Sequence, residues 1–187
     1  MKASFLSVSI LILMVYNLEQ NNINFAPKQL FAEIKNISKS ENPTFVQLQS
    51  NANFAIDTVN ERYLKIQNAS PVQFVYIGRV KTCRAGGCTS PKAATSNDSY
   101  EFFDYFILFD ASAKVLSVRI YNYEATHGQE ITVKKWLNQF IGYNGSEELT
   151  VGKNIDAVSG ATISVYSITD NISLKTQRLK RYLLNQS

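Results

Sequence analysis

Histidine and cysteine are scarce in this chain, and their scarcity excludes one large class of metal sites. The 187 residues include one His and two Cys. A four-ligand zinc site built from His and Cys alone needs one such residue more than the chain has. The composition therefore excludes a His/Cys zinc enzyme, and we expect no metal site.

An excess of positive charge is also missing from most of the chain. The formal net charge is +4. Four basic residues without an acidic neighbour follow Asp170 and account for it: Lys175, Arg178, Lys180 and Arg181. A nucleic-acid-binding domain carries a broad basic face, whereas the rest of this chain is neutral overall. We therefore expect no nucleic-acid partner.

The N-terminus carries a short apolar run over residues 5–16, preceded by Lys2. A membrane-spanning helix needs about 20 apolar residues, whereas the core of a signal peptide needs roughly 7–15. Residues 1–20 are thus predicted to be a signal peptide or a short membrane anchor. We expect an exported protein in the periplasm or on the outer face of the cytoplasmic membrane. No small-x-small cleavage site follows the run, so cleavage stays open.

Hydrophobic patterns predict an α+β fold with a mostly antiparallel sheet. Stretches rich in β-branched and aromatic residues predict strands near residues 73–82, 102–109 and 114–123, the last two forming a hairpin around a short turn. Helical spacing predicts helices over 27–37, 133–140 and 161–184, and a weaker helical pattern covers 54–66.

The long C-terminal helix is predicted to be amphipathic. The apolar side chains of Ile168, Ile172 and Leu179 recur at helical spacing and are predicted to be buried. The basic side chains that we expect to be largely exposed are Lys175, Arg178 and Arg181. Contact of this basic face with anionic lipid or an acidic partner is a less favoured alternative to simple solvation.

The two cysteines, Cys83 and Cys88, enclose Arg-Ala-Gly-Gly. In an exported chain this spacing favours a small-loop disulfide, which would stabilise the loop by roughly 2 kcal/mol. Catalytic dithiols more often have the tighter Cys-x-x-Cys spacing. A redox-active pair stays open as the alternative.

The segment 154–164 is predicted to be a polar turn that leads into the long helix. Asp156 or Ser159 is placed to cap this helix, and Thr162 falls in its first turn. First-turn amides have no partner within the helix, and the helix dipole is positive there, so an anion is favoured.

The motif Asp156-Ala-Val-Ser-Gly-Ala-Thr162 resembles the flavinylation motif of the FMN-binding domain family. This family includes the C subunit of the sodium-translocating NADH:quinone reductase and the G subunit of the Rnf complex. The resemblance implies that FMN is esterified through its phosphate to Thr162 by a flavin transferase with FAD as donor. It extends over roughly residues 70–184.

A second resemblance lies in the segment from Tyr123 to Gly142, which includes His127 and Trp136. Better-known members have Glu-Thr-Pro-Gly where this chain has Ala-Thr-His-Gly. The residues thereby implied in cofactor binding are Thr162, Asp156, Ser159, Gly160, Ala161, His127 and Trp136. The flavin ring needs an apolar surface, for which Tyr143, Trp136 and Tyr166 are candidates.

The resemblance implies an FMN-binding domain over residues 70–187, after the leader and a helical extension over 21–69. The leading hypothesis is an exported, covalently flavinylated electron carrier that is not an enzyme on its own. Its partners would be the flavin transferase and redox proteins of the membrane or periplasm. Two alternatives stay open: a flavin/dithiol oxidoreductase that uses Cys83 and Cys88, and a non-catalytic envelope binding module.

Overall fold

The computed structural model describes residues 22–51, 54–84 and 100–186. Five strands form one antiparallel sheet in chain order: β1 (Thr44–Gln47), β2 (Glu61–Gln67), β3 (Phe74–Arg84), β4 (Tyr100–Phe109) and β5 (Val115–Tyr123). The predicted strand and hairpin are thus confirmed, and β1 and β2 extend the sheet beyond them.

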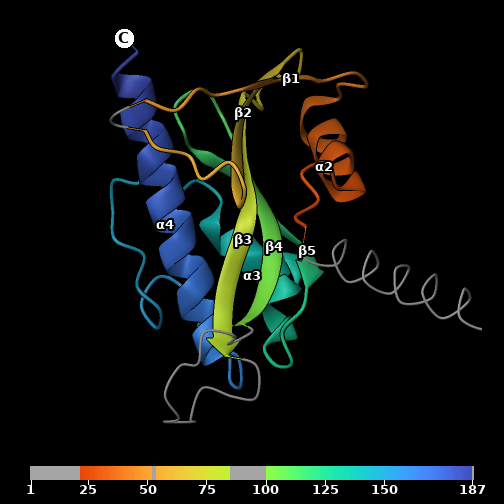
Figure 1. The fold of residues 1–187 in the computed structure, drawn as a ribbon. Coiled ribbons are helices and arrows are strands. Elements are labelled where there is room, and N and C mark those ends of the chain that lie inside the picture. The colour runs from red at the N-terminus through yellow and green to blue at the C-terminus, as the bar shows by residue number, and fades with distance from the viewer. Residues whose placement is uncertain (1–21, 52–53, 85–99, 187) are drawn as a thin grey trace, which may run out of the picture.

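Helices cover both faces of the sheet. The elements are α2 (Lys28–Ser38), η1 (Gln129–Thr132), α3 (Lys134–Leu137), η2 (Asn138–Phe140) and α4 (Thr162–Leu184). The long helix α4 lies along one face and α2 along the other (Figure 1). The α+β class and the three predicted helices are confirmed, with Pro27 as the N-cap of α2.

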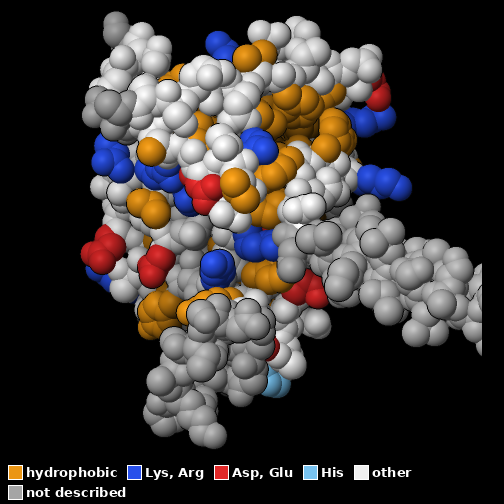
Figure 2. All heavy atoms as spheres, in the orientation of Figure 1, with side chains coloured by type: hydrophobic (Ala, Val, Ile, Leu, Met, Phe, Trp, Pro, Cys, Tyr) orange, Lys and Arg blue, Asp and Glu red, His pale blue; other side chains and the backbone are white. Residues whose placement is uncertain are grey.

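Strand alternation divides the apolar residues into two cores. Tyr63, Tyr76 and Tyr105 belong to the core that includes the buried side of α4. Ile66 and Ile77 belong to the core that includes α2. Next to the second core, hydrophobic side chains gather on the surface between α2 and β1 (Figure 2). There the ring of Phe45 packs against this core and meets the ring of Phe31 edge to face.

The weak helical pattern over residues 54–66 is wrong. A turn ends at Asn60, and Glu61–Gln67 forms β2, which pairs with both β1 and β3. Val59 is 76% exposed, while Tyr63 and Ile66 are buried on opposite faces of the sheet. Apolar residues three and four apart imitate a helix here because the strand is buried on both of its faces.

The prediction for α4 is correct on its apolar side and partly wrong on its basic side. Ile168, Ile172 and Leu179 are fully buried, and Arg181 is exposed as expected. The side chains of Lys175 and Arg178 are only 12% and 20% exposed. They are covered because both reach the carboxylate of Glu61, at 2.5 and 3.1 Å.

Several sequence-based predictions concern residues that the structure does not describe. The leader over residues 1–20 and Cys88 lie outside the described residues, and of Cys83 only the backbone is described, within β3. The described part of the predicted extension contains α2 together with β1 and β2, so the sheet continues across residue 70. No helix of the described residues is both long and apolar enough to span a membrane.

Candidate functional site

The helix α4 begins at Thr162, and its first turn is uncapped by any side chain. Ala161 is the N-cap residue, and no side-chain hydrogen bond closes the helix end. The predicted cap by Asp156 or Ser159 is therefore wrong. Within the described part of the chain, none of the hydrogen bonds has the amide of Thr162, Ile163 or Ser164 as its donor. These amides and the helix dipole leave a favourable place for an anion.

The surface around Thr162 is open. Thr162 and Gly160 are exposed, whereas Ala161 between them is 3% exposed and anchors the turn in the core. A Cβ atom built on Gly160 would meet no atom within 4 Å. The Thr162 side chain is thus accessible, while the buried Ala161 holds the backbone beside it in place.

The motif segment before α4 is held by the segment around Trp136. The backbone amide of Asp156 donates to Gln139 Oε1 at 2.5 Å, and Trp136 Nε1 donates to the carbonyl of Asp156 at 3.0 Å. Asp156 itself is exposed, and no hydrogen bond within the described residues uses its carboxylate. The chain therefore fixes the Asp156 backbone and leaves its carboxylate free.

A turn after β5 presses against the first turn of α4. The hydroxyl of Tyr123 donates to the carbonyl of His127 at 2.5 Å and lies 3.1 Å from Ser164 Oγ. Gly128 has a φ of +88°, and a Cβ there would lie 2.9 Å from Ser164 Oγ and from the Tyr123 hydroxyl oxygen. Burial raises the pKa of Tyr123 above its ordinary value.

The structure thus brings together two segments that the sequence analysis singled out separately. Trp136 is half-buried, meets Phe140 edge to face and supports Asp156. His127 contributes its backbone carbonyl, while its side chain is exposed and forms no hydrogen bond with Thr162 among the described residues. Sequence reasoning did not indicate the contacts of Tyr123 with Ser164 and of Gln139 with Asp156, because these partners lie 41 and 17 residues apart.

The aromatic candidates for the flavin ring differ in exposure. Tyr143 is 4% exposed, and its hydroxyl pairs with Ser173 Oγ at 2.9 Å, so it offers no face to a ligand. Tyr166 is 51% exposed, one turn beyond Thr162 on α4. No group of His, Cys, Asp and Glu that could hold a metal ion occurs among the described residues.

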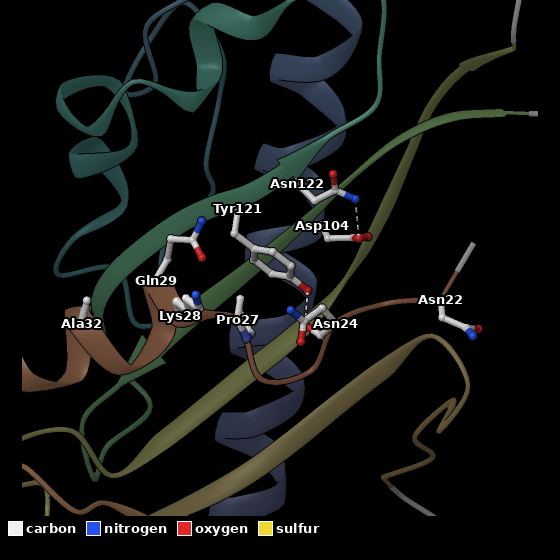
Figure 3. Close-up of a pocket in the computed structure, with 9 residues that line it drawn as sticks. All are labelled: Asn22, Asn24, Pro27, Lys28, Gln29, Ala32, Asp104, Tyr121 and Asn122. Carbon is white, nitrogen blue, oxygen red and sulfur yellow. Dashed lines mark hydrogen bonds between the residues drawn. The ribbon is translucent and has the colours of Figure 1, made fainter. Parts of the chain in front are cut away.

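A separate cavity of about 600 Å³ lies on the other side of the sheet, between the start of α2 and strands β4 and β5 (Figure 3). Its floor is formed by Asp104, Tyr121 and Asn122. Asp104 is already paired with Arg79 at 2.7 Å and accepts from Asn122 at 3.1 Å. None of the residues predicted to bind a cofactor lines this cavity.

The model of the FMN-binding domain family matches residues 102–173. The matched segment runs from β4 into α4 and includes both the turn at Gly128 and the motif that ends at Thr162. The match confirms the resemblance of this segment to the FMN-binding domain family. No curated protein matches the chain.

The residues at the start of α4 fit the phosphate of FMN. The phosphate carries negative charge and several acceptor oxygens, which suit the unused amides of the first turn. The exposed Thr162 hydroxyl and the open surface over Gly160 leave room for it. The chemistry of this donor set therefore agrees with the family match.

Proposed function

We propose that the protein is an exported electron carrier that holds FMN through a phosphoester bond to Thr162. Binding of FMN follows from the family match to residues 102–173. The observation that supports the covalent bond is the placement of Thr162, whose hydroxyl is exposed at the first position of α4 beside unused amides.

The attachment is a transfer of FMN from FAD. The bond between Thr162 Oγ1 and the FMN phosphorus forms, and the pyrophosphate bond of FAD breaks with AMP as the leaving group. The threonine hydroxyl loses its proton, and no atom changes its oxidation state. A flavin transferase would catalyse this step, and the free carboxylate of Asp156 is available for that enzyme or its metal ion.

The described residues have distinct roles in holding the product. The amides of the first turn of α4 would stabilise the phosphate charge, and the buried Ala161 keeps these amides in place. Trp136 and Gln139 hold the backbone at Asp156, and Tyr123 holds the turn at Gly128. Bound FMN supplies the capacity to accept and donate one or two electrons.

Export gives a reason for the covalent bond. The apolar run at residues 5–16 is typical of a signal peptide or short anchor. Outside the cytoplasm a carrier has no flavin pool from which to replace a lost cofactor, and a covalent bond prevents the loss. The carrier would exchange electrons with redox proteins of the membrane or periplasm.

Peptide mapping of protein produced together with an exported flavin transferase tests the proposal. The peptide that contains Thr162 should be heavier by one FMN less one water. Thr162→Ala should abolish this mass and leave the fold intact, while Thr162→Ser should still accept FMN because a hydroxyl remains.

The exposed Thr58 offers a matched control, since it lies in a turn remote from α4 in the sequence. Thr58→Ala should be modified like the wild type. An unmodified Thr162 in the presence of an active transferase would refute covalent attachment at this position.

A further inference from the structure

Two large apolar side chains lie exposed beside Thr162 at the start of α4. Ile163 is 40% exposed and Tyr166 is 51% exposed. Ala161 and Val165 beside them are buried. The first two turns of α4 thus expose Ile163 and Tyr166 next to the exposed Thr162. A singly exposed apolar side chain needs no explanation, but an exposed aromatic ring beside the proposed attachment point is available to contact the attached group.

Tyr166 is the exposed aromatic residue that helical geometry places next to the attachment point. Residues four apart on an α-helix are neighbours on the same face, with Cβ atoms about 5–6 Å apart. Thr162 and Tyr166 are four apart on α4, which is continuous from Thr162 to Leu184. A group attached to the Thr162 hydroxyl is therefore held close to the phenol ring of Tyr166.

Tyr166 also differs from the other aromatic candidates in having an unused ring. Within the described residues its hydroxyl forms no hydrogen bond and its ring forms no ring–ring contact. Trp136 is already engaged through its Nε1 and through Phe140, and Tyr143 is buried. A flat, partly apolar ring with one free face is what a flavin ring needs for stacking.

We propose that Tyr166 is the surface on which the flavin ring of the Thr162-attached FMN rests. This inference depends on the proposed function, because it concerns FMN attached at Thr162. The flavin ring would in turn cover the exposed apolar surface of Ile163 and Tyr166. Tyr166 is thus a ligand-binding residue whose role is to hold the ring.

Flavin fluorescence gives a direct test on the FMN-loaded protein. A phenol in contact with a flavin quenches its fluorescence, because an electron passes from the phenol to the excited flavin and then returns; a phenylalanine ring does not do this. Tyr166→Phe should therefore raise the fluorescence per attached FMN by about two-fold or more, since a stacked pair is populated most of the time. Fluorescence anisotropy should stay high in Tyr166→Phe, which keeps the stacking face, and fall in Tyr166→Ala.

Two further variants are matched controls. Tyr182→Phe removes a phenol from the same helix, about 30 Å from Thr162 at 1.5 Å per residue. Leu174→Ala removes an exposed apolar side chain, 47% exposed, two turns beyond Tyr166. Neither should change the fluorescence or the anisotropy.

The outcomes separate this inference from the proposed function. Intact mass first establishes that each variant carries FMN. If FMN is attached and Tyr166→Phe fluoresces like the wild type, only the inference is overturned. If Trp136→Phe gives the rise in place of Tyr166→Phe, the ring rests on Trp136 and the inference is likewise wrong. If wild-type Thr162 carries no FMN, the proposed function fails and the inference fails with it.

Discussion

The start and the middle of α4 are built in opposite ways. At its start Thr162, Ile163 and Tyr166 are exposed, and the first-turn amides have no partner among the described residues. Farther along, Lys175 and Arg178 lie against the buried Glu61, at 2.5 and 3.1 Å from its carboxylate. We call the start of the helix open, because its side chains and amides face solvent, and the middle closed, because its basic side chains are paired with the buried Glu61.

The difference shows that most of the basic side chains of this helix serve its packing within the molecule. Of the four basic residues that produce the net charge, Lys175 and Arg178 fasten the helix to β2, and Lys180 donates to the carbonyl of Asn144 at 3.0 Å. Little of the basic excess is therefore available for an acidic partner or lipid. The exposed surface that fits a ligand has apolar and hydroxyl side chains.

The core between the sheet and α4 contains buried tyrosines, and these should make the free energy of unfolding fall steeply at alkaline pH. Burial raises the pKa of Tyr63, Tyr76 and Tyr105 above the ordinary value, so these phenols are neutral when folded. In the unfolded chain each ionises near pH 10, so their stabilisation is complete below about pH 10 and is lost as the pH rises. Well above about pH 10, each such group contributes about 1.4 kcal/mol per pH unit, so these three contribute about 4. Tyr121 and Tyr123, whose pKa values burial also raises, add to this slope.

Urea unfolding measured between about pH 8 and pH 11 tests this slope. The hydroxyl of Tyr105 donates to Asn171 Oδ1 at 2.7 Å. Tyr105→Phe should reduce the slope by about 1.4 kcal/mol per pH unit, after the loss of that bond is subtracted. A slope equal in the wild type and in Tyr105→Phe would contradict the assignment to buried tyrosines.

Removal of the Glu61 carboxylate should lower the free energy of unfolding through the middle of α4 and leave the start of α4 unaffected. Glu61 is 4% exposed, and Glu61→Ala would leave the cations of Lys175 and Arg178 largely buried without their counter-charge. We expect a loss of about 3–5 kcal/mol in the free energy of unfolding. The attachment of FMN to Thr162 should persist in the folded fraction, because the open end does not contact Glu61.

Glu147→Ala, at an exposed position, is the control and should change the free energy of unfolding by less than about 0.5 kcal/mol. A similar loss in both variants would mean that the cluster around Glu61 does not hold α4. If Glu61→Ala fails to fold, Glu61→Gln keeps the hydrogen-bonding group and should give a smaller loss that is still measurable.

The features that could be predicted from the sequence are those set by residues close together in the chain. The apolar stripe of Ile168, Ile172 and Leu179 predicts a buried helix face correctly, because helical spacing is a local property. The burial of Lys175 could not be predicted, because its partner Glu61 lies 114 residues away. The strand β2 was missed because both of its faces are buried, which removes the simple alternation.

In the candidate site, too, local features were predicted correctly and contacts between distant residues were not. The motif that ends at Thr162 is contiguous and resembles a known pattern, so its position at a helix start was predicted correctly. The capping by Asp156 or Ser159 was wrong, since the backbone of Asp156 is held instead by Gln139 and Trp136. The contact between Tyr123 and Ser164 joins residues 41 apart, and no local signal in the sequence indicates it.

A substitution at Gly128, in the turn that packs against the start of α4, should give the smallest effect on the free energy of unfolding. Gly128→Ala should cost about 1–3 kcal/mol of unfolding free energy, because its φ is +88° and the new Cβ would lie 2.9 Å from both Ser164 Oγ and the Tyr123 hydroxyl. Gly142 has a similar φ of +93°, but a Cβ there would meet no atom within 4 Å. Gly142→Ala should therefore cost only the backbone strain, about 1 kcal/mol. Urea unfolding of both variants measures the difference, which is the contribution of close packing between the turn and α4. Equal losses would mean that the turn does not pack closely against the helix. Tyr123→Phe should then also leave the free energy of unfolding unchanged.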